Sequence, residues 1–157
     1  MHRARGFTLI EIAICCFILM IIMLIALPSV EGVLKNRRLQ RSLDQMNSMV
    51  RQAQQRSVQE RQPYLIVWQK DSIILRPESL AQGENAAPDD TIALDKYHSF
   101  SLRLPAALEK NPLPQWIFWP SGTCEPADVS FQGSDGAWEV NYSPLTARPQ
   151  IVRYAAK

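Results

Sequence analysis

The sequence predicts an α+β protein with one long N-terminal helix followed by a mostly antiparallel, β-sandwich-like head. Three observations support this fold class. An apolar run covers residues 7–28, an amphipathic pattern covers 29–62, and short apolar segments alternate with turn residues over 63–157. The length of 157 residues leaves room for one small domain after the helical part.

A short basic leader, residues 1–6, opens the chain and ends at a Gly6–Phe7 junction. The following 21 residues, Phe7–Leu27, carry no charge except Glu11. As a helix such a run is about 30 Å long, which is enough to cross the hydrocarbon core of a bilayer. We therefore expect a transmembrane helix over residues 7–28.

Two residues within this segment stand out chemically. A carboxylate at the centre of a membrane helix costs about 2.5–3.5 kcal/mol, so acidic residues such as Glu11 usually mark a function. Pro28 lacks a backbone donor and therefore predicts either a bend in the helix or the end of the span.

An amphipathic helix is expected over residues 29–62. Its apolar positions follow one another at intervals of three and four residues, which places them on one face of a helix: Leu39, Leu43, Met46, Val50, Ala53 and Ser57. Together with the anchor it predicts a helix of 53 residues from Phe7 to Gln59, bent near Pro28. Pro63 is a natural stop signal.

The head is expected to consist of short strands joined by loops and turns. The Gly133–Gly136 segment is a hairpin signal, and the polar or proline-rich stretches 79–90 and 105–115 predict loops. The predicted strands cover residues 64–68, 73–75, 91–95, 100–104, 116–119, 129–131, 138–142 and 151–154.

All four tryptophans fall in strand candidates. We expect Trp68 and Trp138 to lie in the core. Side chains alternate along a strand, so one of Trp116 and Trp119 should point outward.

Charge and cysteine content exclude several classes of protein. Residues 30–61 carry seven basic and three acidic side chains, whereas 63–157 carry eight basic and eleven acidic ones. The mildly acidic head argues against a nucleic-acid partner. Cys15 and Cys16 lie in the apolar run, so Cys124 has no partner for a disulfide in the head. We expect no cofactor.

The residues Arg5-Gly6-Phe7-Thr8-Leu9-Ile10-Glu11, followed by the apolar run, resemble the N-terminal signal of type IV prepilins and type II secretion pseudopilins. The resemblance implies cleavage between Gly6 and Phe7 by a prepilin peptidase, which then methylates the Phe7 amine. It implies that Glu11 pairs with the Phe7 amine of a neighbouring subunit and that the helix bends at Pro28. The implied partners are other pilin-like subunits, an inner-membrane assembly platform and possible secreted cargo.

The head also resembles one branch of this family, the H-type minor pseudopilins. The resemblance rests on Trp116–Gly122, Val129–Phe131, Trp138–Pro144 and Pro149–Val152. It implies a single-pass protein of the bacterial inner membrane with its head in the periplasm. Major pseudopilins hold calcium in the head, but Asp128 and Asp135 do not form a spaced ligand set, so we expect no metal site.

Three alternatives stay open. The first is a minor pilin of a DNA-uptake apparatus. The second is an unprocessed signal-anchored protein with a cytoplasmic β domain, which the basic residues after the apolar run favour (Lys35, Arg37, Arg38 and Arg41). The third is a membrane-anchored enzyme, against which stand the lack of a metal-spaced His/Cys cluster and of a nucleophile elbow. Cys124 and His98 are not expected to form a catalytic dyad.

Overall fold

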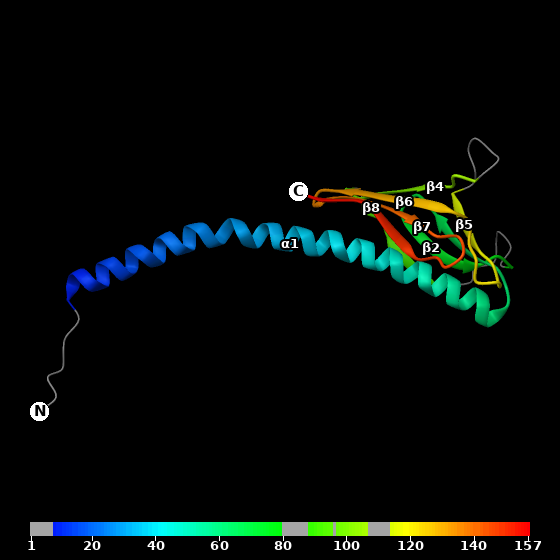
Figure 1. Cartoon of the computed structure of the whole chain (residues 1–157), viewed down its shortest axis with the longest axis horizontal. Coiled ribbons are helices and arrows are strands. Elements are labelled where there is room, and N and C mark those ends of the chain that lie inside the picture. Colours follow the sequence, from blue (N-terminus) through cyan, green and yellow to red (C-terminus); the bar gives the residue numbers. More distant parts are fainter. Residues whose placement is uncertain (1–7, 80–87, 96, 107–113) are drawn as a thin grey trace, which may run out of the picture.

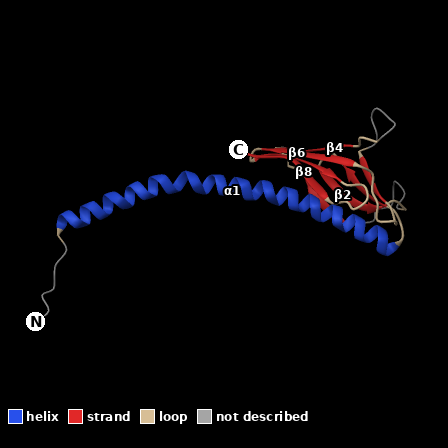
Figure 2. Cartoon of the chain, viewed as in Figure 1, coloured by secondary structure: helices blue, strands red, loops and turns tan. Residues whose placement is uncertain are grey.

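A computed structural model describes residues 8–79, 88–95, 97–106 and 114–157 of the chain, without the side chains of 24–30. Helix α1 (Leu9–Glu60) comes first, and all the strands follow it. Figures 1 and 2 show that the strands gather along the C-terminal half of α1, whereas its N-terminal half extends away from them. The expected order of a long helix followed by a β head is therefore confirmed.

Helix α1 has clear signals at both ends. Thr8 is its N-cap, with φ −80° and ψ 150°. At the other end Arg61 adopts a left-handed conformation with φ 53°, and Pro63 prevents the helix from resuming. The helix has 52 residues, close to the predicted span. It continues through position 28, and Figure 1 shows one continuous arch.

The predicted transmembrane helix over residues 7–28 is not confirmed. Among the residues that the structure describes, no helix is both long and apolar enough to cross a membrane. Phe7 and the side chains of 24–30 lie outside the described part of the chain.

The predicted apolar stripe on the second half of α1 is confirmed. Met49 joins it, and the stripe forms one side of the core of the head. Ser57 is fully buried, and its hydroxyl donates to the carbonyl oxygens of Gln54 (2.9 Å) and Trp119 (3.2 Å), which offsets the cost of burying a polar group. All six predicted positions have exposed fractions of 6% or less: Leu39, Leu43, Met46, Val50, Ala53 and Ser57.

The first sheet has the strand order β3-β2-β1-β5, and all its pairs are antiparallel. Alternate residues of β2 and β5 face the core, as expected for strands with one covered side. Its strands are β1 (Tyr64–Trp68), β2 (Ser72–Pro77), β3 (Asp90–Ala93) and β5 (Gln115–Phe118).

The second sheet has the order β4-β6-β7-β8 and is also antiparallel throughout. Helix α1 contacts strands of both sheets, so the helix shares one core with them. The expected sandwich arrangement of the two sheets is not confirmed. The strands of this sheet are β4 (Ser99–Arg103), β6 (Ala127–Gly133), β7 (Gly136–Tyr142) and β8 (Pro149–Ala156).

Every predicted strand is present, and no boundary differs from its prediction by more than two residues. The predicted hairpin is also correct: Gly133 pairs with Gly136 across a two-residue loop. Parts of both predicted loops, residues 80–87 and 107–113, lie outside the described residues.

The tryptophan predictions are only partly correct. Trp138 is buried as expected, and Trp116 is the inward member of its pair. Trp119 follows β5 and is half-buried. Trp68 was expected in the core but is half-buried and packs against its edge, because it is the last residue of β1.

Candidate assembly helix

The first half of α1 exposes apolar side chains around its whole circumference. Every residue from Leu9 to Met23 is exposed, and the exposed fraction of the large apolar side chains ranges from 42% at Ile21 to 88% at Leu9. A helix that is apolar on all sides is typical of a segment surrounded by other helices or by lipid. Because no described part of the head covers it, this surface requires an apolar partner from outside the chain.

The start of this helix is a capping box formed by Thr8 and Glu11. Glu11 Oε2 accepts hydrogen bonds from the Thr8 backbone N–H (3.1 Å) and from Thr8 Oγ1 (3.2 Å). In return the Glu11 backbone N–H donates to Thr8 Oγ1 at 3.4 Å. The reciprocal bonds satisfy amides that lack a partner within the helix and favour a helix start at Leu9.

The capping box gives Glu11 a local role that the sequence analysis missed, although Thr8-Leu9-Ile10-Glu11 matches the pattern Ser/Thr-x-x-Glu. Only Oε2 takes part in it, and Oε1 has no hydrogen bond to any described residue. A carboxylate accepts several hydrogen bonds, so Oε1 is available to an external cation while the cap stays intact.

The other predicted site residues are less well placed. Gly6 and Phe7 lie outside the described residues. Pro28 lies within α1, where its ring removes one backbone donor from the helix.

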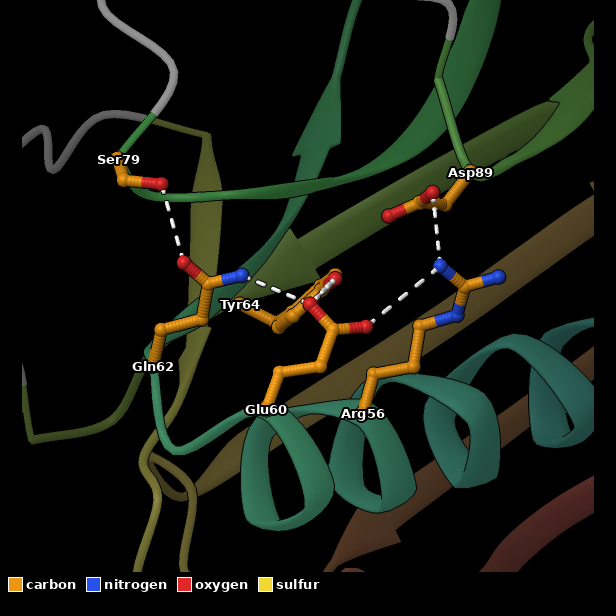
Figure 3. A network of polar contacts seen from close by, with 6 residues as sticks. All are labelled: Arg56, Glu60, Gln62, Tyr64, Ser79 and Asp89. Carbon is orange, nitrogen blue, oxygen red and sulfur yellow. Dashed lines mark hydrogen bonds and ion pairs between the residues drawn. The ribbon is translucent and has the colours of Figure 1, made fainter.

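At its other end α1 is fastened to the head by a polar network, which Figure 3 shows. Glu60 Oε2 accepts from the Tyr64 hydroxyl at 2.7 Å and from Gln62 Nε2 at 2.8 Å. Ser79 Oγ donates to Gln62 Oε1 at 3.1 Å. The helix terminus, β1 and the segment after β2 are therefore joined through side chains.

Arg56 extends this network to the segment before β3. Its Nη1 lies 2.8 Å from Asp89 Oδ1 and 3.9 Å from Glu60 Oε1. Burial and the hydrogen bond to Glu60 raise the pKa of Tyr64 to about 12. The hydrogen bond from Tyr64 in turn lowers the pKa of Glu60. The shifts favour a neutral tyrosine beside a charged carboxylate.

Further hydrogen bonds join the side of α1 to the second sheet and to the loop between β5 and β6. Two of them come from buried aromatic residues: Trp138 Nε1 donates to Ser42 Oγ at 2.8 Å, and the Tyr142 hydroxyl donates to Asn47 Oδ1 at 2.7 Å. Gln54 Nε2 donates to the Gly122 carbonyl oxygen at 2.7 Å. Each of these polar groups finds its partner across the helix–head interface, so the head fixes the position of the helix.

In the described part of the head, no three potential metal-ligating side chains form a group. Asp128 accepts from Arg103 Nε at 3.0 Å and from Asn141 Nδ2 at 2.7 Å. Cys124 is buried, and burial, with a smaller contribution from the charge of Glu125, raises the pKa of its thiol to about 11. A buried, protonated thiol is a poor nucleophile.

A family model of the prokaryotic N-terminal methylation motif matches residues 1–27 of the chain. This match covers Gly6, Phe7 and Glu11, the residues on which the N-terminal resemblance rests. None of the curated proteins compared with the chain matches it.

Solved structures with a similar fold include the minor pseudopilin EpsH of the type 2 secretion system of Vibrio cholerae. One EpsH structure has a TM-score of 0.55 at 10% identity and covers 78% of this chain and 98% of its own. The type IV minor pilin FimU of Pseudomonas aeruginosa has a TM-score of 0.54 at 17% identity, with 74% and 90% covered.

The chain has a type IV pilin-like fold. In this pilin-like chain the methylation motif extends into the apolar N-terminal half of α1. The C-terminal half of α1 packs against the head.

Proposed function

We propose that this pilin-like chain is a minor subunit of a bacterial filament of the type II secretion or type IV pilus kind. A prepilin peptidase cuts it between Gly6 and Phe7 and methylates the new amino terminus. Residues 7–28 then anchor it in the inner membrane, with residues 63–157 as a periplasmic head, until the helix moves into the filament.

The observation that carries the proposal is the coincidence of two features in one segment. The methylation motif matches residues 1–27, and the same segment contains an all-round apolar helix that no described residue covers. Burial of such a surface is worth about 25 cal/mol per Å² of apolar area, which favours association with lipid and with other helices.

Glu11 gives this association a defined register. Burying a carboxylate or an ammonium group in an apolar helix bundle costs free energy unless the two groups pair with each other. We propose that Glu11 Oε1, which the capping box leaves unused, accepts a hydrogen bond from the N-methylated amine of Phe7 of the adjacent subunit.

Mass spectrometry of the chain purified from membranes tests the proposal directly. The mature form should begin at N-methyl-Phe7, and Gly6→Leu should leave the leader attached. An intact leader on the working wild-type chain would instead support the unprocessed signal-anchored protein. A protease-protection assay on spheroplasts checks the periplasmic location of the head, which the basic residues after the apolar run argue against.

The similarity to EpsH and to FimU does not favour one filament over the other, because their TM-scores are nearly equal. A deletion strain distinguishes the two filaments. Loss of protein secretion with normal pili assigns the chain to a secretion filament, and loss of pili assigns it to a pilus.

A further inference from the structure

Four strands of the head lie at a sheet edge: β3 and β5 in the first sheet, and β4 and β8 in the second. The edge of β5 is partly occupied, because Cys124 bridges to Phe118. An open edge presents unpaired backbone N–H and C=O groups that an extended strand of another chain can bind. These four edges differ in charge and exposure, and two of them complement each other.

Strand β8 is the most open of the four. It is eight residues long, and all eight residues are exposed, on both faces of the sheet. Ile151 and Val152 in its middle are 58% and 65% exposed. Soluble proteins usually protect an edge of this length, so an exposed apolar one indicates a site for an added strand.

The C-terminal segment that contains β8 is uniformly basic. Residues 143–157 include Arg148, Arg153 and Lys157 and no acidic residue. None of these three side chains has an ion pair with a described residue. Like charges facing each other across strands are destabilising, so β8 disfavours a second β8 and favours an acidic strand.

Strand β3 is the acidic edge. Asp90 is its first residue and Asp95 lies two residues past its end, whereas Asp89, just before it, is ion-paired with Arg56. The Thr91 backbone N–H is bonded by the Asp90 carboxylate at 2.8 Å instead of by a strand. A shallow hollow of about 310 Å³ lies along β3, lined by its four residues with Gln45 and Ser48 of α1, so there is space beside this edge.

The two remaining edges do not offer this match. Strand β5 contains no charged residue. On β4 the one charged side chain, Arg103, is already bonded to Asp128. Among the described edge strands, therefore, only β3 has acidic side chains that can complement the basic side chains of β8.

We propose that β8 of one copy of this chain adds as an extra strand to β3 of a second copy. A β8 carbonyl oxygen replaces the Asp90 carboxylate as acceptor for the Thr91 N–H. The released carboxylate then lies beside the cations of β8, Arg153 above all. Strand β3 has four residues, so about half of β8 takes part.

The contact joins two different surfaces, so a second copy that uses β8 still offers its own β3 to a third. Such a head-to-tail interface gives a closed ring or an open helical series, depending on the rotation between the copies. The inference rests on the proposed function in one respect, because anchored helices hold the heads close together and raise their effective concentration for a short contact.

Cross-linking between full-length copies tests the pairing. Cys15→Ala and Cys16→Ala remove the exposed thiols, and the buried Cys124 stays. One tagged copy carries Ile151→Cys on β8, and a differently tagged copy carries Ala93→Cys on β3. A short bismaleimide added to membranes should give a product that contains both tags. Ser101→Cys on the exposed face of β4 is the matched control and should give little product with Ile151→Cys.

Charge reversal identifies the cause. All copies carry Glu139→Gln, because Glu139 lies opposite Arg153 in the β7–β8 pair and would face a like charge in Arg153→Glu. In this background Arg153→Glu or Asp90→Lys alone should reduce the product about fivefold, the effect of roughly 1 kcal/mol from one cross-strand charge pair. Copies that carry both Arg153→Glu and Asp90→Lys should recover the cross-linked product, because opposite charges again face each other across the two strands. Circular dichroism of each variant checks that the head is folded.

Three results overturn the inference: no product from the β3–β8 pair, an equal product from the β4 control, or no effect of charge reversal. Cross-linking of Ile151→Cys to a different protein overturns the assignment to a second copy. The N-terminus of the same samples is read by mass spectrometry. An unprocessed chain that still gives the charge-dependent product contradicts the proposed function alone, and a processed chain without the product contradicts this inference alone.

Discussion

The indole Nε1 of Trp138 on β7 donates a 2.8 Å hydrogen bond to Ser42 Oγ on α1. The same hydroxyl donates its hydrogen to the Leu39 carbonyl oxygen at 2.7 Å, while its oxygen accepts from the indole, so both contacts are satisfied. Trp138 is only 1% exposed, and Ser42 is half-buried. Together with the Tyr142–Asn47 bond, this contact joins α1 to the second sheet through polar atoms in a mostly apolar interface.

Ser42→Ala should destabilise the head by about 1–3 kcal/mol, because it leaves a buried indole N–H without an acceptor. Urea unfolding of the full chain in detergent micelles, followed by circular dichroism, measures this effect. Ser48→Ala, on the exposed side of the same helix, should change stability by only about 0.5 kcal/mol. Equal effects from both variants would contradict a role for the indole bond.

Gly136→Ala should destabilise the chain by more than about 1 kcal/mol. Gly136 has φ 146°, and a Cβ there would collide with the Ala155 carbonyl oxygen of β8 and lie 2.9 Å from Leu39 Cδ2. Gly32→Ala is the matched control: it meets no atom within 4 Å and lies in α1, where alanine favours the helix by about 1 kcal/mol. The two variants should therefore shift the midpoint of thermal unfolding in opposite directions.

Stability should fall as the pH rises from about 10 to about 12, partly because of Tyr64. Burial and the hydrogen bond to Glu60 raise the pKa of Tyr64 to about 12 from 10.0, so the folded chain holds this proton after the unfolded chain has lost it. Tyr64→Phe should flatten part of this decrease in urea titrations at several pH values. A slope that Tyr64→Phe leaves unchanged would show that the Tyr64–Glu60 bond does not contribute. Tyr142, whose pKa is also raised by burial, should account for a separate part.

Cys124 should react slowly with a disulfide reagent while the head is folded. Burial raises the pKa of its thiol to about 11 from 9.0, and its Sγ lies 3.7 Å from the Ser143 carbonyl oxygen. With Cys15→Ala and Cys16→Ala in place, the rate at pH 8 should be about 100-fold lower than in urea. A fast reaction in the folded chain would place the thiol in contact with solvent.

Three variants separate helix capping from charge pairing at the amino end of α1. Glu11→Gln keeps an acceptor for both Thr8 donors but removes the charge. Thr8→Val removes the hydroxyl of the cap but keeps the charge, and Glu11→Val removes both the carboxylate acceptor of the cap and the charge. If the proposed pairing is correct, Glu11→Gln should abolish assembly as Glu11→Val does, whereas Thr8→Val should retain most of it. Sheared filaments quantified by immunoblot, with membrane fractions as the insertion control, measure the outcome.

Most of the fold could be predicted from local periodicity. The buried stripe from Leu39 to Ser57 repeats at helical intervals, and every strand was visible as a short apolar run between turn residues. Both signals come from neighbouring residues. The hairpin between β6 and β7 was predictable for the same reason, because Gly133 and Gly136 bracket a two-residue turn.

Contacts between distant residues could not be predicted in this way. The bond from Gln54 to Gly122 joins residues 68 positions apart, and no sequence pattern marks it. Trp68 was predicted as a core residue from its apolar strand, but it is the last residue of β1, and only the folded structure shows that the core ends before it. The role of Glu11 in helix capping was readable from Thr8, yet its position in an apolar run favoured a different interpretation.

The unbroken course of α1 from the exposed rod into the core has a geometric consequence. A continuous helix advances about 1.5 Å and turns about 100° with each residue. Inserting one residue between the rod and the buried stripe would therefore rotate the whole head by more than a quarter turn around the rod. The direction in which the head faces is set by the number of residues before Leu39.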